Sequence, residues 1–302
     1  MKRWPQIVWL ADGRRLHLQD GPIDLIVQAD GSDASRRAAY DAAARRFHGL
    51  LDELCDELPL LRSAADPRQC ALKGTVARRM HAAVAPLASE HFITPMAAVA
   101  GAVAEEILGV MVGEARLDRA YVNNGGDIAL HLADGAQFTV GLVDRPDGPG
   151  MIGTTIIGSA DPSRGIATSG RHGRSFSLGI ADAVTVLART AGQADAAATI
   201  IANAVDLPGH PAIVRCRADE LQPDNDLGAR LVTRHVSVLQ PDEAMSALEA
   251  GVGKARALFA AGLIDGAALR LQGEARVVAL KAPDVKAPLA VSRQMPEGAI
   301  YA

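Results

Sequence analysis

The sequence predicts an α+β protein in which mixed or antiparallel β elements pack against helices. The first thirty residues and the middle third consist of short segments rich in Val, Ile and Thr, separated by Gly, Asp and Pro. Longer segments with helical periodicity lie between and after them, and they do not alternate with single strands as in a doubly wound sheet. Because no repeat or low-complexity linker interrupts the pattern, residues 1–302 are expected to form a single domain.

The composition narrows the class of protein. Of the 302 residues, 49% are hydrophobic, which is enough for a full core. Only ten residues are aromatic and many are Ala, so close contacts through small residues are expected. A net charge of −4 with scattered basic residues argues against a nucleic-acid partner. The charge gives no indication of the oligomeric state.

Cysteine usage and hydropathy indicate the compartment. Cys55, Cys70 and Cys216 are widely spaced and form no CxxC pair, which is typical of free thiols in a reducing compartment. The N-terminal stretch has no uninterrupted apolar run, and no other window reaches the roughly 18 apolar residues of a membrane span. The protein is therefore expected to be cytoplasmic, without a membrane partner.

In the first third, two hairpins precede helices. Asp12-Gly13 and Asp20-Gly21 separate three alternating segments, which predicts strands at 6–11, 14–19 and 23–29. A long amphipathic helix is expected from Ser32, ending before Pro67, with an apolar side made of Ala43, Phe47, Leu50, Leu54, Leu58 and Leu61.

Two further helices are expected before the β-rich middle. Residues 74–90 have a helical pattern that Pro86 is expected to interrupt. Residues 93–112 form the second, with Thr94 as N-cap and Pro95 at the first helical position. Its many small residues allow a second backbone to pack very close.

The remaining elements follow from the same patterns. Helix 193–205 comes after the β-rich middle, and the last third begins with a strand at 231–239. A helix from Pro241 is expected to bury a stripe of Met245, Leu248, Val252, Ala255 and Phe259. The expected strands of the middle and of the final hairpin are 119–124, 127–132, 137–143, 153–158, 165–169, 182–188, 268–272 and 275–280.

Three Gly-punctuated stretches contain the candidate site residues. The first is "YVNNGGDIAL", 121–130, with Asn124, Gly125, Gly126 and Asp127. Two glycines after a strand allow positive φ and a close approach to a ligand, and they equally suit a simple hairpin turn. Both interpretations remain open at this point.

The second stretch is "GIATSGRHGRSFSLG", 165–179. A strand ends in Thr168, Ser169 and Gly170, and a loop with Arg171, His172 and Arg174 follows. Hydroxyls, free amides and arginines in one loop suit a phosphate or pyrophosphate, while a polar surface loop has the same composition. No P-loop or GxGxxG motif is present.

The third stretch is "QADAAATIIANAV", 193–205. Asp195 and Thr199 are four residues apart, which places them one turn apart on one helix face. Asp195 is either an ordinary helix cap or, with Thr199, a ligand of a hard cation such as Mg²⁺, whose shell substrate phosphates would complete.

In this order, "YVNNGGDIAL", "GIATSG", "AVTV" and "ADAAAT" resemble the motif series of the ApbE-like flavin transferases. That family has a GGD turn, an ATSG strand end, a VTV strand and an ADALAT-like helix start. The resemblance covers about 119–205, extends weakly to 95–106, and indicates a divergent branch of the superfamily.

The resemblance implies a fold, an activity and a site. Members are α+β proteins that bind FAD and Mg²⁺ and transfer FMN onto a Thr of an acceptor protein, releasing AMP. By resemblance, Asp195 and Thr199 would hold the metal. The flavin nucleotide would lie against the GGD and ATSG elements, at Asn124, Gly125, Gly126, Asp127, Thr168, Ser169 and Gly170.

Two family segments have no counterpart here. The His-x-x-Asp-Pro-x-Thr-Gly segment is missing, with Gly179 standing where its His would be and Asp182 three residues on. The Lys-Gly-Tyr-Ala segment has no Lys or Tyr equivalent at 94–101. No catalytic residue is assigned, and the candidates are Asp182 and His172. The alternative function is a non-catalytic flavin- or nucleotide-binding or assembly protein that retains the fold.

Overall fold

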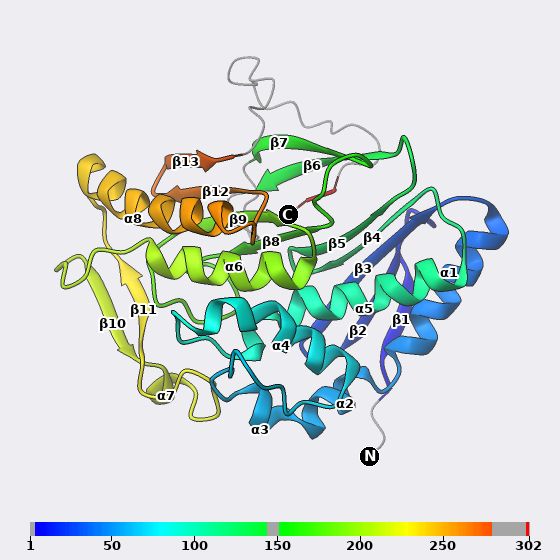
Figure 1. Cartoon of the computed structure of the whole chain (residues 1–302), viewed down its shortest axis with the longest axis horizontal. Helices are drawn as coiled ribbons and strands as arrows, with labels where there is room; N and C mark the ends of the chain where they lie inside the picture. Colours follow the sequence, from blue (N-terminus) through cyan, green and yellow to red (C-terminus); the bar gives the residue numbers. More distant parts are fainter. Residues whose placement is uncertain (1–3, 144–150, 280–299, 302) are drawn as a thin grey trace.

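A nine-stranded antiparallel sheet spans the computed structural model, which describes residues 4–143, 151–279 and 300–301 (Figure 1). Its order is β1-β2-β3-β4-β5-β8-β9-β12-β13, so strands from both ends of the described chain meet in one sheet. The strands are β1 Gln6–Trp9, β2 Leu16–Asp20, β3 Ile23–Asp30, β4 Arg119–Asn124, β5 Asp127–Leu132, β8 Gly165–Ser169, β9 Ala183–Ala188, β12 Gly266–Leu271 and β13 Glu274–Val278.

Two smaller sheets complete the β structure. In the three-stranded sheet, β6 pairs with β7 antiparallel and with β14 parallel, while β10 and β11 form a separate antiparallel pair. Their bounds are β6 Gln137–Val143, β7 Met151–Gly158, β14 Ile300–Tyr301, β10 Ile213–Arg217 and β11 Leu231–Val236.

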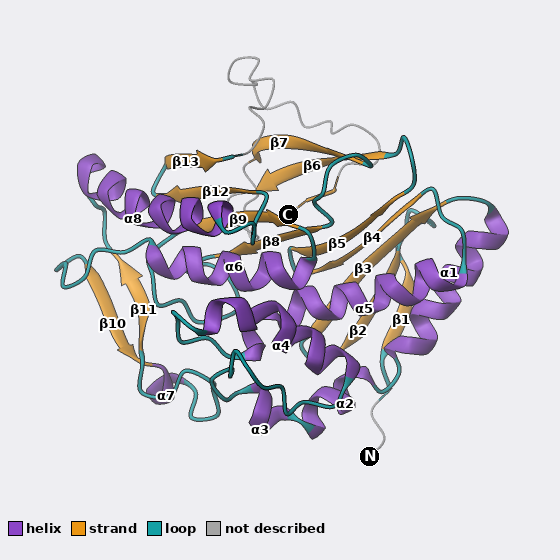
Figure 2. Cartoon of the chain, viewed as in Figure 1, coloured by secondary structure: helices purple, strands orange, loops and turns teal. Residues whose placement is uncertain are grey.

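Helices gather on one side of the large sheet (Figure 2). Alternating residues explain the two faces: Val122 and Ala129 belong to the core under the helices, whereas Tyr121 and Ile128 pack with Phe138 of β6 on the opposite side. This arrangement confirms the α+β class.

The helices are α1 Asp33–Phe47, α2 Leu50–Asp56, α3 Leu58–Leu61, α4 Thr75–Ala88, the 3-10 turn η1 Pro95–Ala98, α5 Val99–Glu114, α6 Ala191–Ala204, α7 Ala218–Leu221 and α8 Pro241–Ala260.

The predicted long helix from Ser32 is wrong, because the chain breaks into α1, α2 and α3. Gly49 has φ +78° between α1 and α2, a conformation that ends a helix and favours glycine. The prediction for Pro86 is also wrong, since α4 continues through it. Thr94 takes the predicted N-cap position with Pro95 first after it, but of the short η1, and α5 begins only at Val99. The Thr94 side chain makes no capping bond; its hydroxyl bonds to Asp226.

Smaller corrections concern the last third. The strand predicted at 231–239 ends at Val236, and β10 and α7 were not predicted. In α8, the predicted Leu248, Val252 and Ala255 are buried, whereas Met245 and Phe259 are 40% and 45% exposed. The buried face is completed instead by Ala244, Ala247, Gly251 and Leu258. The final residue of the predicted 275–280 strand lies outside the described residues.

Among the described residues, one helical stretch, Pro95–Glu114, is long and apolar enough to cross a membrane, which the sequence pattern did not indicate. Half of this stretch is buried. Glu105 and Glu106 within it form ion pairs with Arg79 and Arg46, and α5 packs between α1, α4, α6 and the sheet. Its apolar side chains therefore form part of the core.

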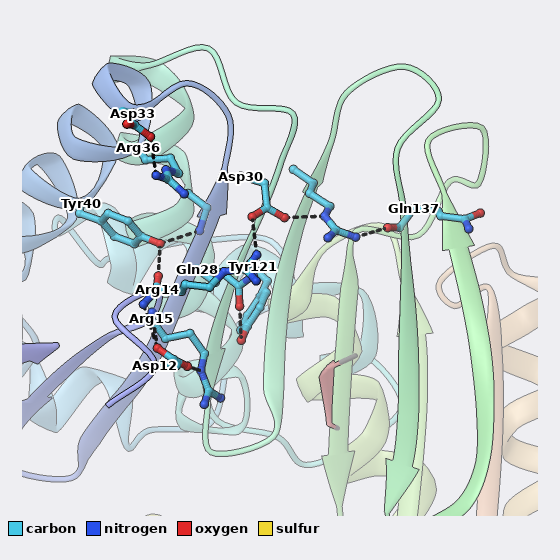
Figure 3. Close-up of polar contacts among 12 residues, drawn as sticks. Asp12, Arg14, Arg15, Gln28, Asp30, Asp33, Arg36, Tyr40, Tyr121 and Gln137 are labelled. Carbon is cyan, nitrogen blue, oxygen red and sulfur yellow. Dashed lines mark hydrogen bonds and ion pairs between the residues drawn. The ribbon is translucent and has the colours of Figure 1, made fainter. Parts of the chain in front are cut away.

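Polar contacts lock the N-terminal strands onto α1 and β4 (Figure 3). The Tyr40 hydroxyl of α1 donates to the carbonyl of Arg14 at 2.6 Å. Asp30 at the end of β3 accepts from Arg119 of β4 at 2.7 Å, and Arg119 also donates to the carbonyl of Gln137 in β6. The contact of Arg119 with Gln137 thus joins the large sheet to the three-stranded sheet.

Helices α5 and α6 touch through their backbones at Gly101. A Cβ atom at this position would lie 2.3 Å from the carbonyl oxygen of Ala191, so any side chain larger than hydrogen pushes the two helices apart. The expected close packing through small residues is thus confirmed at this crossing.

We expect Gly101→Ala to lower the free energy of unfolding by about 1–3 kcal/mol, because overpacking displaces α6. Gly109→Ala in the same helix is the matched control, since no atom lies within 4 Å of its Cβ position. That variant should be neutral or stabilised by up to about 1 kcal/mol. Urea unfolding of both measures the difference, and equal effects would contradict the close crossing.

Candidate functional site

The "NNGGD" stretch is a two-residue hairpin turn between β4 and β5. Asn124 pairs with Asp127 across the turn, and Gly125 and Gly126 have φ of +67° and +111°. Two successive positive φ values are what a type I′ turn requires, so glycine is favoured at both positions. The hairpin interpretation is confirmed, and the residues on either side of the glycines are therefore held in fixed positions.

Side chains at both ends of this turn attach it to other elements. Asn124 is buried and its amide donates to the carbonyl of Ala100 at the start of α5, at 3.2 Å. Asp127 Oδ1 accepts from the backbone N–H of Thr168 in β8, at 3.3 Å. Residues two apart on a strand point to the same face of the sheet. Asn124 therefore shares the helix-covered face with Val122, and Asp127 shares it with Ala129.

Asp195 is not a cap of its own helix, so the first of its two open interpretations is wrong. Helix α6 begins at Ala191, and its N-cap is Thr190, whose hydroxyl accepts from the N–H of Gln193. Asp195 lies one turn further on and accepts from the N–H groups of Ala100 and Gly101 in α5, the latter at 3.1 Å. Its carboxylate therefore caps the neighbouring helix.

Asp127 and Asp195 come close enough to influence each other's ionisation. Burial raises the pKa of Asp195 to about 7, against the opposing effect of the α5 amides. Burial and the charge of Asp195 raise the pKa of Asp127 well above its usual range, against the opposing effects of the Thr168 N–H and the Arg174 charge. Two poorly solvated carboxylates with so little compensating charge favour a bound proton or cation between them.

The other predicted ligands lie around this pair. Thr199 follows Asp195 by one turn of α6 and is partly exposed. Ser169 lies on the same sheet face as Ala167, which is the helix-covered face. The Thr168 hydroxyl points to the opposite face, where it bonds to Thr185 at 2.8 Å, so its contribution here is its backbone N–H.

Close backbone packing surrounds the end of β8. A Cβ at Gly170 would lie 2.3 Å from the carbonyl oxygen of Asp182. A Cβ at Gly179 would lie 2.2 Å from the carbonyl oxygen of Ala202, so a histidine cannot occupy that position in this fold. The position expected to correspond to the missing His is closed to any side chain.

Three charged or titratable side chains of the loop after β8 make different contacts. Asp182 bonds to both Arg171, at 2.9 Å, and His172, at 3.2 Å. The two catalytic candidates, Asp182 and His172, are therefore in contact with each other. Arg174 is exposed; its guanidinium packs against Gly125 beside Asp127 and donates to the carbonyl of Pro22 at 3.3 Å. Among the described residues it forms no ion pair within 4 Å.

The site is thus assembled from the β4–β5 turn, the end of β8, α6 and the N-terminus of α5. The α5 amides were not predicted as part of it; the small residues at 97–104 were a signal only of close packing. Within the described ranges no group of three or more His, Cys, Asp or Glu could hold a metal. The available donors are all oxygens, namely two carboxylates and a hydroxyl, and a hard cation prefers this type of donor.

Comparisons with known proteins show what the chain is similar to. A family model described as "AbpE bacteria" matches residues 7–277. A UPF0280 protein of Methanopyrus kandleri is 37% identical over 185 residues, covering 60% of this chain and 69% of that protein. A UPF0280 protein of Methanococcoides burtonii is 33% identical over 199 residues, covering 65% and 79%. A mutant of the flavin transferase ApbE from Vibrio cholerae is 12% identical with a TM-score of 0.36, covering 89% of this chain and 98% of that one.

Asp195→Asn should stabilise the metal-free protein above neutral pH. The pKa of Asp195 is higher in the fold than the roughly 3.9 of an unfolded Asp, so its contribution to stability is present below about pH 4 and is lost as the pH rises through 7. We expect the variant to gain about 1–3 kcal/mol at pH 8 relative to wild type and little at pH 4.

Thermal unfolding at both pH values, without divalent cations, measures this difference. Glu114→Gln removes an exposed carboxylate from α5 and is the control for a general charge effect. An Asp195→Asn variant that is destabilised equally at both pH values would contradict the uncompensated burial of this carboxylate.

Proposed function

The chain belongs to the AbpE bacteria family, and from this membership we propose that it binds FAD or a related phosphorylated cofactor together with Mg²⁺ and transfers FMN to an acceptor protein. The match over 7–277 confirms the ApbE-like superfamily that the four motifs predicted. The proposed cofactor and reaction rest on that resemblance and on the chemistry of the site.

The proposal is supported above all by the pairing of Asp127 with Asp195. Mg²⁺ takes oxygen ligands, keeps several waters and is commonly held by one or two carboxylates together with substrate phosphates. Asp195 and Asp127 supply such carboxylates from two different elements, and Thr199 adds a hydroxyl from the same side of α6. A cation there would also favour the ionised form of both acids, whose pKa values are raised by burial and, for Asp127, also by the charge of Asp195.

Groups that suit the phosphates lie beside the pair. Arg174 extends from its loop across Gly125, next to Asp127, where a guanidinium can bind a phosphate with two hydrogen bonds. Ser169 and the glycines of the turn allow a close approach on the helix-covered face. When bound, Mg²⁺ would neutralise pyrophosphate charge, and the residues named here would orient the cofactor.

Transfer would join the FMN phosphate to a Thr hydroxyl of the acceptor protein, with AMP leaving and the hydroxyl proton passing to a base. The described residues at this site offer Asp127 and Asp195 as carboxylates of raised pKa. His172 and Asp182 are less suitable, because Asp182 already accepts from Arg171 and from His172.

Non-catalytic binding is the second candidate function, and the packing at Gly179 favours it. No side chain fits where the family's His would be, and Tyr121 faces the other side of the sheet, where it contacts Phe138. A protein with these features would retain a phosphorylated ligand and serve as a binding or assembly partner without releasing AMP.

For wild type we expect FAD to bind more tightly with Mg²⁺ than without it, measured by flavin fluorescence. Asp195→Asn should abolish the effect of the metal, because the variant loses a charged ligand, and Thr199→Val should weaken it less. If Asp195→Asn binds FAD like wild type with the same metal dependence, the metal site is wrong.

Release of AMP distinguishes the two candidate functions. The same proteins are incubated with FAD, Mg²⁺ and a candidate acceptor protein under anaerobic conditions, and AMP is quantified. Release by wild type and not by Asp195→Asn supports the transferase. FAD affinity without AMP from any tested acceptor supports the non-catalytic binder.

A further inference from the structure

We propose that Glu105 is a positioning residue for Asp195: it holds the first turn of α6 in place, so that the Asp195 carboxylate stays on the α5 amides. The inference rests on the proposed function only in that it assigns a cation to the carboxylate pair of Asp127 and Asp195. Within the described part of the chain, the polar contacts of Glu105 are with Gly192 and Arg79 and not with the candidate site residues. Its effect is transmitted through Gly192.

The contact itself is short and specific. Glu105 Oε1 accepts from the backbone N–H of Gly192 in the first turn of α6, at 2.7 Å. That N–H has no acceptor within its own helix, because the first amides of any helix lack one. A Cβ at Gly192 would lie 3.3 Å from the same oxygen, so the glycine allows the carboxylate to approach this closely.

Helices α5 and α6 therefore cap one another. Glu105 of α5 accepts from the first turn of α6, while Asp195 of α6 accepts from the first turn of α5 at Gly101. Each carboxylate is favoured by the positive end of the other helix. Because the two contacts flank the tight backbone crossing, the direction of Asp195 depends on Glu105.

The guanidinium of Arg79, on a third helix, holds Glu105 in place. Arg79 of α4 contacts Glu105 at 3.1 Å, and the Glu105 side chain is only 13% exposed. Arg79 also reaches Glu106 at 3.3 Å, and Glu106 bonds to Arg46 of α1 at 2.8 Å. This network holds the Glu105 side chain in one position against α6.

Glu106 provides a matched control. It is the neighbouring residue on the same helix, it is as little exposed as Glu105, and it shares the Arg79 partner. Among the described residues, its hydrogen bonds run to Arg46 of α1 and Arg79 of α4 and not to α6. Loss of Glu106 should therefore cost stability without moving Asp195.

The test compares Glu105→Ala, Glu105→Gln and Glu106→Ala with wild type. Mg²⁺ alone is titrated and followed by thermal stabilisation, which gives an apparent affinity. We expect Glu105→Ala to weaken Mg²⁺ binding by about tenfold or more, as loss of a group that orients a metal ligand does. Glu105→Gln should remain close to wild type, because its amide oxygen still accepts from Gly192, and Glu106→Ala should keep wild-type affinity.

Amide hydrogen exchange at residues 99–102 gives a readout that needs no metal. Protection of these amides should fall in Glu105→Ala and persist in Glu106→Ala, because only the first variant releases the turn that directs Asp195. Unchanged protection in Glu105→Ala, or an equal loss in both alanine variants, overturns the positioning role. If wild type binds no Mg²⁺ while the exchange result holds, the proposed function fails and the positioning role stands.

Discussion

Reciprocal capping between α5 and α6 is the interaction on which the candidate site depends. Glu105 satisfies an amide of α6, Asp195 satisfies amides of α5, and Gly101 allows the backbones to meet between these contacts. A helix start that lacks a partner for its amides is costly when buried. The two acids therefore stabilise the crossing of the two helices.

The same arrangement imposes an electrostatic cost. The carboxylate that caps α5 lies near Asp127 of the β4–β5 turn, and burial raises the pKa of both acids. A protein selected for stability alone would not retain two such charges with so little compensation. This conflict between local stability and charge is typical of functional sites, and a bound cation would resolve it.

Much of the fold could be predicted from local patterns. The strands at 119–124, 127–132 and 165–169 were predicted with the bounds that the structure has, because Gly and Asp mark both ends of each segment. The wrong predictions concern helix boundaries that tertiary contacts determine. Pro86 stays within α4, and the chain breaks at Gly49 although the apolar spacing continues past it, since packing and a positive φ override periodicity.

The sequence by itself determined the α+β class and the order of the motifs, because these follow from periodicity, turn residues and motif spacing. The resemblance of those motifs indicated the superfamily, which the family model over 7–277 confirms. The sequence also marked Asp195 and Thr199 as one helix face, since an interval of four residues fixes that geometry. Only the tertiary structure decided that Asp195 caps α5 rather than α6, that its charge raises the pKa of Asp127, and that Arg171 and His172 are bound to Asp182. These contacts join residues distant in the chain, and their partners are set by how the helices cross the sheet, which no local pattern encodes.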